Sequence, residues 1–237
     1  MSHEHASDPS GHPSTETFWN EHYGQREQIW SGRPNAVLVD EVSALAPGRA
    51  LDVGCGEGAD AIWLAGRGWQ VTGVDVSGVA LDRARAAAEA AGVSGSVTWQ
   101  QQDLGSGFPT GEFELVSAQF LHSPVELPRP EILRAAAAAV APGGRLLIVG
   151  HSGLPSWVGH DQPDVHFVTP EEVLASLALD PASWRTISCE ARTRAVVDPH
   201  GEHATLDDGV VLVERLGAAE NPRAGAGQGE QQSGAAA

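Results

Sequence analysis

Three glycines and a nearby acid form the first pattern in this chain that could bind a ligand. Gly54, Gly56 and Gly58 follow a short apolar run, and Asp75 lies 19 residues after Gly56, at the end of a second apolar run. Glycines let a backbone turn sharply and approach a ligand where a Cβ would collide. An acid at about this distance accepts hydrogen bonds from a ribose in nucleotide-binding βαβ units. The pattern therefore predicts a ligand that carries a ribose.

The spacing of the glycines and the charges around them narrow the choice of ligand. The G-x-G-x-G spacing departs from the G-x-G-x-x-G that holds a pyrophosphate on a helix N-terminus. Asp52, Glu57 and Asp60 surround the turn, and their carboxylates would repel a pyrophosphate. They suit a ligand with an ammonium or sulfonium group. S-adenosylmethionine has both groups and a ribose, and it is the expected cofactor.

Composition and charge restrict the partners. The chain has 237 residues, a formal net charge of −17, and 14 basic residues that are all arginine. This balance argues against a surface that follows nucleic-acid phosphates. Cys55 and Cys189 are the two cysteines, so the sequence holds no disulfide framework. With no membrane-length apolar run and no signal peptide, we expect a cytoplasmic monomer or homodimer with no nucleic-acid or membrane partner.

Low-complexity segments flank one expected domain over residues 18–216. Residues 1–17 are rich in Ser, His and Pro and are expected to be a disordered tail that leads into a lid. Residues 217–237 contain mainly Gly, Ala, Gln and Glu and are expected to be a second disordered tail, because neither segment offers enough apolar surface to bury. The histidines of the first tail are more consistent with a solvated segment than with a metal site: His3, His5 and His12.

Strands and helices are expected to alternate through the body of the domain, which is typical of a doubly wound α/β sheet. The expected strands cover residues 49–53, 70–75, 96–101, 114–119 and 145–150. The expected helices cover residues 58–67, 78–91 and 130–140. Ser77 is a suitable N-cap, and Pro142-Gly143-Gly144 predicts a turn before the fifth strand.

The last part of the domain predicts a helix and a hairpin. Thr169-Pro170-Glu171-Glu172 has the pattern of a capping box with proline at the first helical position. Two further strands are expected over 184–195 and 204–215. The segment Asp198-Pro199-His200-Gly201 between them predicts a turn, so the two strands are expected to pair antiparallel.

Five segments together resemble the class I S-adenosylmethionine-dependent methyltransferases over roughly residues 18–216. They are Leu51-Asp52-Val53-Gly54-Cys55-Gly56-Glu57-Gly58, Val74-Asp75, Gln102-Asp103-Leu104, Leu115-Val116-Ser117 and Ala141-Pro142-Gly143-Gly144. The resemblance implies a Rossmann-like, doubly wound, seven-stranded α/β sheet that is mostly parallel and ends in an antiparallel hairpin. Within this class, residues 30–35 and 119–122 look most like bacterial tellurite-resistance and thiopurine-type methyltransferases.

The resemblance also implies which residues bind the cofactor. The glycines would pass under its methionine and ribose parts, Asp75 would hold both ribose hydroxyls, and Asp103 and the Leu104 amide would bind the adenine. Trp30 would shield the sulfonium, and Arg33 would pair with the carboxylate; the alternative is that Trp30 packs a lid and Arg33 caps a loop. The full expected set is Trp30, Arg33, Asp52, Gly54, Cys55, Gly56, Glu57, Gly58, Asp75, Val76, Asp103, Leu104 and Gln119.

Two histidines are candidates for the acceptor side. His122 and His151 follow two strands that are expected to be neighbours, and ligands of open α/β sheets bind outside the carboxyl ends of the strands. A neutral histidine there could take a proton from an attacking hydroxyl or amine. The alternatives are hydrogen-bonded structural histidines, or a soft-metal or metalloid site completed by His160 and His166.

These patterns predict methyl transfer from S-adenosylmethionine by in-line displacement to a small-molecule acceptor. The sequence presents no evident acid–base pair, which favours a thiol or a metalloid oxyanion over an oxygen or nitrogen acceptor. Cys55 lies before a helix N-terminus, where a thiolate is stabilised, but a small residue fitted to a tight turn is the simpler interpretation. The alternatives are a catalytically silent S-adenosylmethionine-binding regulator or scaffold and, less compatible with the glycine spacing, a nicotinamide-dependent oxidoreductase.

Overall fold

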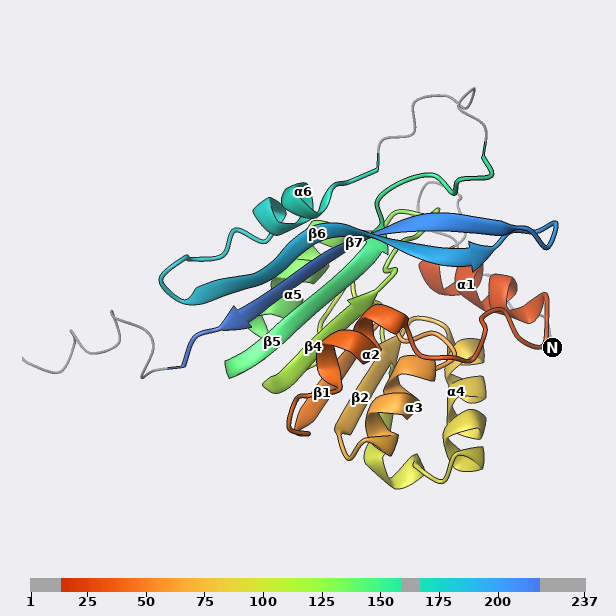
Figure 1. Cartoon of the computed structure of the whole chain (residues 1–237). Coiled ribbons are helices and arrows are strands. Elements are labelled where there is room, and N and C mark those ends of the chain that lie inside the picture. Colours follow the sequence, from red (N-terminus) through yellow and green to blue (C-terminus); the bar gives the residue numbers. More distant parts are fainter. Residues whose placement is uncertain (1–13, 159–166, 218–237) are drawn as a thin grey trace, which may run out of the picture.

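A seven-stranded sheet forms the centre of the molecule (Figure 1). The structure is a computed structural model that describes residues 14–158 and 167–217. The strand order is β3-β2-β1-β4-β5-β7-β6, with β1 to β5 parallel and β7 antiparallel to both of its neighbours. The expected Rossmann-like fold is confirmed. The strands are β1 (Arg49–Val53), β2 (Gln70–Asp75), β3 (Val97–Gln101), β4 (Phe113–Gln119), β5 (Val140–His151), β6 (Trp184–Val197) and β7 (His203–Arg215).

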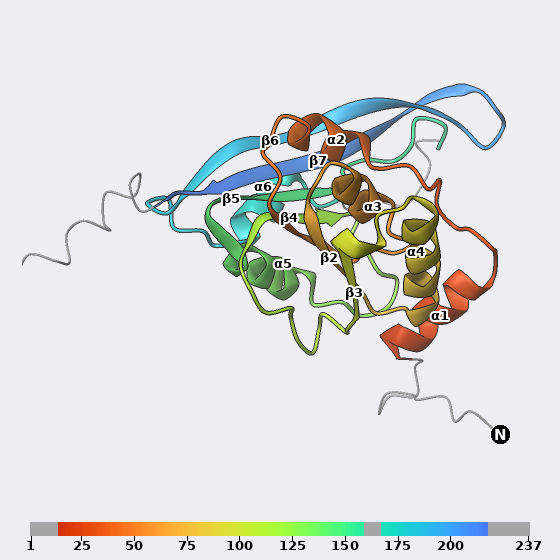
Figure 2. The ribbon, with the colours of Figure 1, turned by 90° about the horizontal axis from the view of Figure 1, so that it is seen from below.

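Helices cover both faces of the sheet (Figure 2). Side chains alternate along a strand, so Leu146 and Ile148 of β5 pack toward α5 (Arg129–Ala138) and α6 (Pro170–Ser176). Leu147 and Val149 pack on the other face, against α2 (Ala36–Val42) and α3 (Ala59–Gly66). Burial on both faces explains why the strand sequences are nearly continuous apolar runs.

Side chains cap the helices at several of the expected places. Ser77 accepts a hydrogen bond from the Ala80 amide at the start of α4 (Gly78–Ala90), and the capping box of Thr169 and Glu172 is present at α6. Helix α1 (Thr15–Gly24), capped by Ser14, was not expected. Residues 15–17, assigned to the first tail from the sequence, belong to this helix. Residues 1–13 and 218–237 lie outside the described part of the chain.

The prediction of a turn at Pro142-Gly143-Gly144 was wrong, because these residues lie within β5. Strand β5 already pairs with β4 at Val140, and the register shifts before Arg145. The glycine-rich segment is therefore an irregularity within one long strand. A Cβ on Gly144 would lie 2.9 Å from the Ala141 carbonyl oxygen, so the closely packed backbone excludes a side chain there.

The carboxyl ends of β1, β2, β4 and β5 lie along one edge of the sheet, where loops and helix N-termini surround them. The hairpin of β6 and β7 extends past this edge (Figure 1), and its turn is held by Asp198, whose side chain accepts from the amides of His200 and Glu202. None of the described helices has the length and hydrophobicity to span a membrane.

The packing of α3 generates a prediction for Gly58, its N-cap. This glycine has φ +81°, and a Cβ would lie 2.5 Å from Trp99 Cη2 and 2.8 Å from Ala84 Cβ. Gly58→Ala should lower the free energy of unfolding by about 2–4 kcal/mol, because strain and overpacking add. Gly66→Ala at the other end of α3, where a Cβ meets nothing within 4 Å, should have almost no effect. Urea unfolding followed by tryptophan fluorescence measures both, and equal stability of the two variants would contradict the packing argument.

Candidate cofactor and acceptor site

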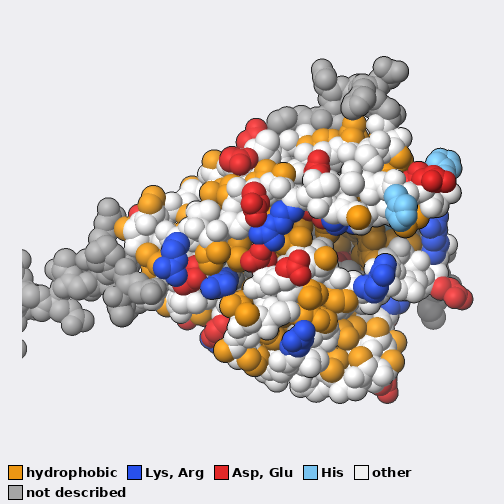
Figure 3. Space-filling model, viewed as in Figure 1, with side chains coloured by type: hydrophobic (Ala, Val, Ile, Leu, Met, Phe, Trp, Pro, Cys, Tyr) orange, Lys and Arg blue, Asp and Glu red, His pale blue; other side chains and the backbone are white. Residues whose placement is uncertain are grey.

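A cavity of about 1180 Å³ opens at the carboxyl ends of the parallel strands. The space-filling view shows a recess between the hairpin and the helices below it, with hydrophobic side chains in its wall (Figure 3). Every site residue expected from the sequence lines this cavity: Trp30, Arg33, Asp52, Gly54, Cys55, Gly56, Glu57, Gly58, Asp75, Val76, Asp103, Leu104, Gln119, His122 and His151.

Asp75 holds the glycine loop in place from the end of β2. Its carboxylate accepts hydrogen bonds from the Gly56 amide at 2.9 Å and from the Ser77 amide at 2.8 Å. Burial raises the pKa of Asp75, and the backbone hydrogen bonds act in the opposite direction. A carboxylate has about four acceptor positions, so this side chain keeps acceptor capacity beside the cavity.

Two buried oxygens at the ends of β1 and β4 have no hydrogen-bond donor among the described residues. They are Asp52 Oδ2 and Gln119 Oε1. Asp52 is 2% exposed and lies opposite Ser117 in the pairing of β1 with β4. The side-chain amide of Gln119 donates to the Ser117 hydroxyl. Burial, followed by the nearby charges of other aspartates, raises the pKa of Asp52 well above its usual range. Two unpartnered acceptors in one cavity wall fit a cationic amino group.

Two of the acidic residues near the glycine loop hold the segment of residues 25–35, here called the strap. Glu57 accepts from the Trp30 amide at 3.0 Å and from Arg83 Nη1 at 2.8 Å. Asp60 accepts from the Asn35 amide at 2.7 Å, and burial raises its pKa to about 6. The sequence groups these acids with Asp52 as charges that suit a cationic ligand; both line the cavity, and both also hold the strap.

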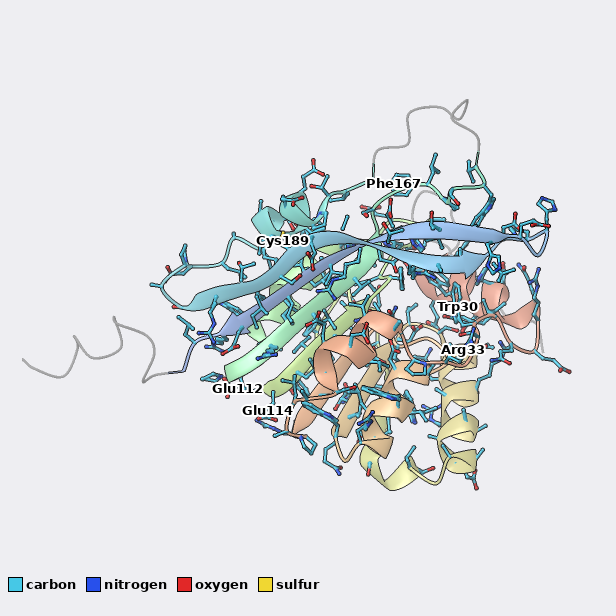
Figure 4. All side chains as sticks on the ribbon, viewed as in Figure 1. Trp30, Arg33, Glu112, Glu114, Phe167 and Cys189 are labelled. Atoms are coloured by element: carbon cyan, nitrogen blue, oxygen red, sulfur yellow. The ribbon has the colours of Figure 1, made fainter. Side chains whose placement is uncertain are left out.

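An aromatic pair joins α1 to the strap above the glycine loop. Trp30 Nε1 donates to Tyr23 Oη at 3.1 Å, and a Cβ on Gly56 would lie 2.8 Å from the same oxygen. The Trp30 side chain is 54% exposed and lies close to Arg33 beneath the hairpin (Figure 4). Sequence reasoning missed Tyr23, although it is the single tyrosine of the chain.

The residues expected at the adenine end lie beside the same cavity. Asp103 Oδ1 accepts from the Gly105 amide at 2.9 Å, which shapes the turn after β3.

Cys55, in the glycine loop, has a pKa raised well above its usual value by burial, and a Cβ on Gly73 would lie 3.2 Å from its sulfur. The thiol therefore packs against β2 as an un-ionised side chain, in agreement with the simpler of its two interpretations.

An unusual backbone conformation at the exit of β4 places the first histidine. Phe120 has φ +50°, its amide donates to the Val149 carbonyl, and the His122 amide donates back to the Phe120 carbonyl at 2.7 Å. A left-handed phenylalanine is strained by about 1 kcal/mol or more. The turn carries His122 over β5, where a Cβ on Gly150 would lie 2.9 Å from His122 Nε2.

The two candidate histidines lie side by side, as the sequence predicted. The rings of His122 and His151 are nearly parallel, with centroids 5.9 Å apart. Burial is the largest cause that lowers the pKa of His122, and the charges of Arg129 and His151 lower it further, to about 4. The ring is therefore neutral at pH 7. A neutral ring can both donate and accept a hydrogen bond.

Behind His151 lies a carboxylate that the sequence did not reveal. Asp208 is 1% exposed, and its Oδ1 lies 3.7 Å from His151 Nδ1 with no hydrogen-bond donor among the described residues. Its Oδ2 accepts from Arg194 Nε at 2.5 Å. The sequence shows no evident acid–base pair, because only the antiparallel register of β5 and β7 brings Asp208 opposite His151.

Among the described residues, no cluster of three or more histidine, cysteine or acidic side chains could hold an ion. His160 and His166, together with the three histidines of the first tail, lie outside the described residues.

Comparisons with known proteins agree with this geometry. Residues 50–144 match the family model described as a methyltransferase domain. The chain is 37% identical over 123 residues to ribosomal RNA small subunit methyltransferase C of Chromohalobacter salexigens, covering 50% of this chain and 36% of that protein. It is 34% identical over 129 residues to 27-O-demethylrifamycin SV methyltransferase of Amycolatopsis mediterranei, covering 52% and 47%. The chain thus spans about half or less of the length of these relatives.

Solved structures share the fold at low sequence identity. A protein studied for the conversion of a disulfide bond into a thioacetal group during echinomycin biosynthesis has a TM-score of 0.66 and 23% identity over 85% of this chain and 93% of its own. TehB from Haemophilus influenzae has a TM-score of 0.61 and 17% identity over 85% and 66%. Residues 50–144 thus match a methyltransferase domain, and the solved structures show that the chain shares their fold.

Proposed function

We propose that this protein transfers a methyl group from S-adenosylmethionine to a small-molecule acceptor. The observation that carries the proposal is that one cavity is lined both by Asp75 and the glycine loop, here called the first wall, and by His122 and His151, here called the histidine wall. A cofactor and an acceptor can therefore meet without solvent between them. Holding the reactants together in this way supplies a large part of the acceleration of a displacement reaction.

The residues of the first wall fit the parts of the cofactor. The unpartnered oxygens of Asp52 and Gln119 would accept from its ammonium group, and Arg33 would pair with its carboxylate. Asp75 would accept from the ribose hydroxyls, and the turn at Asp103 would receive the adenine. When bound, S-adenosylmethionine supplies a methyl group made electrophilic by a positively charged sulfur.

A small acceptor fits this chain better than a nucleic acid, although one relative is a ribosomal RNA methyltransferase. The formal charge of −17 opposes association with a phosphate backbone. The cavity of about 1180 Å³ is somewhat larger than a pocket for one small ligand, so it leaves room for a cofactor together with a small acceptor. The second candidate, a silent cofactor-binding regulator, would use the first wall and leave the histidine wall without a chemical role.

The histidine wall could serve two kinds of acceptor. A thiol or a metalloid oxyanion, which the sequence favours, attacks without a general base. An oxygen or nitrogen acceptor must lose a proton, and His151 could take it, because the adjacent carboxylate of Asp208 would stabilise the protonated ring. Because Asp208 is buried, its charge would act on the His151 ring with little screening by solvent.

Loss of the Asp75 charge should weaken cofactor binding. Asp75→Asn removes charge-assisted hydrogen bonds that are worth about 1.5–3 kcal/mol, so the dissociation constant for S-adenosylhomocysteine should rise roughly 10- to 150-fold. Isothermal titration calorimetry measures this change. Asp82→Asn, on the exposed face of α4, is the matched control and should bind as the wild type does. Unchanged affinity of the Asp75 variant would exclude this carboxylate from the site.

Transfer of labelled methyl groups to a panel of tellurite, selenite, small thiols, catechols and amines tests the reaction itself. If His151 acts as the base, His151→Gln should reduce the rate with catechols and amines by about 10²–10⁴-fold and leave the rate with thiols nearly unchanged. His203→Gln, at the start of β7 and outside the cavity lining, should retain both rates. Cofactor binding without transfer to any acceptor would instead support the regulator.

A further inference from the structure

Arg129 is a cavity residue that the reaction described above does not use. It is the first residue of α5 and lines the cavity near the ends of β4 and β5. Its Nε donates to the Leu121 carbonyl at 3.0 Å, which fixes the direction of the guanidinium. The other donors of the group make no hydrogen bond to a described side chain or backbone atom, so they stay available to a ligand.

Arg129 and Arg194 both line the cavity near the histidine wall, but Arg129 lacks a carboxylate partner among the described residues. Arg194 lies against Asp208, whereas Arg129 forms no ion pair with any carboxylate of the described residues. Partial burial lowers the pKa of Arg129, but the guanidinium remains charged at neutral pH. A partly desolvated cation without an anion is costly unless a ligand supplies one.

The surroundings of Arg129 belong to the acceptor side of the cavity. An added Cβ on Gly150 would lie 3.6 Å from Arg129 Nη2 and 2.9 Å from His122 Nε2, so both polar groups converge above the same glycine. The strand order places β5 on the far side of β4 from β1 and β2, which carry the glycine loop and Asp75. Helix α5 also begins here without a side-chain cap, and its N-terminal amides add positive potential.

We infer that Arg129 binds an anionic group of the methyl acceptor, and that the acceptor class is therefore acidic: an organic molecule that carries a carboxylate, or an inorganic oxyanion. This inference rests on the proposed function. The planar guanidinium matches a carboxylate or oxyanion with two parallel hydrogen bonds. His122, neutral at pH 7, would complete the contact as a hydrogen-bond donor.

Matched acceptors test the charge requirement. The wild type should methylate 3-mercaptopropionate with a kcat/KM roughly 10- to 150-fold above that for 2-mercaptoethanol, as expected for a charge-assisted hydrogen bond. A similar preference should separate 4-hydroxybenzoate from 4-hydroxybenzamide if phenols react. Transfer to selenite or tellurite, and to neither organic acid, would identify the inorganic source. Equal rates for the charged and neutral members of a pair that reacts, with no transfer to an oxyanion, would overturn the inference.

Variants of Arg129 separate acceptor binding from cofactor binding. Arg129→Gln should abolish the preference for the anionic acceptor, Arg129→Lys should keep part of it, and Arg85→Gln, which removes a surface charge from α4, should keep all of it. The affinity for S-adenosylhomocysteine should be the same in all of these proteins. A tenfold loss of that affinity in Arg129→Gln would place the guanidinium at the cofactor instead and would contradict the inference.

A titration of His122 provides a readout that needs no turnover. The groups that face this ring are Arg129 and His151, with Asp208 behind the latter. In histidine-labelled protein saturated with S-adenosylhomocysteine, sodium benzoate should raise the pKa of His122 as it neutralises Arg129. Arg129→Gln should show a raised pKa without benzoate and no further shift with it, while thermal unfolding checks that the variant is folded.

The two proposals fail in different ways. A benzoate-dependent shift of His122 without methyl transfer to any acceptor would refute the proposed function and keep the anion site. Methyl transfer with no charge preference, together with a His122 titration that benzoate does not move, would keep the proposed function and refute the anion site.

Discussion

The carboxylate of Asp75 is the contact on which the rest of the site depends. It accepts from the amide of Gly56 in the glycine loop and from the amide of Ser77 at the start of α4. The Ser77 hydroxyl in turn contacts Asn20 of α1. One buried side chain at the end of β2 therefore fixes the loop, the helix and the N-terminal segment relative to one another. Because burial makes an unpaired carboxylate costly, these amide hydrogen bonds stabilise the charge that a ribose would then share.

The acidic character of the glycine loop has two separate physical roles. Glu57 and Asp60 hold the strap through its backbone amides, and Arg83 neutralises the first of them. Asp52 keeps an oxygen without a donor at the base of the cavity. Two of these acids therefore hold the strap, and the third leaves an acceptor open to the cavity. The same division appears on the opposite wall, where Arg194 is paired and Arg129 is not.

The sequence predicted the parts of the molecule that local patterns control. The parallel strands are apolar runs interrupted by glycines, and Ser77 and Thr169 carry recognisable capping patterns, so these elements were placed within a few residues. The sequence also placed the expected site residues around one cavity, because strand ends of a parallel sheet share an edge. What it could not predict depends on contacts between distant residues. The pairing of His151 with Asp208 requires the register of β5 and β7, and the role of Tyr23 requires the position of α1.

Strand β7 has a consequence for how the protein is made. It is inserted between β5 and β6, yet it is the last strand to leave the ribosome. Until it arrives, β5 is an edge strand whose backbone groups on that side lack a partner strand, a state that invites pairing with other chains. The half of the sheet built from β1 to β4 contains the sequence needed for its own pairing much earlier in synthesis. The cavity wall of His122 and His151, where the acceptor would bind, is thus completed last. The part that would bind the cofactor can form before it.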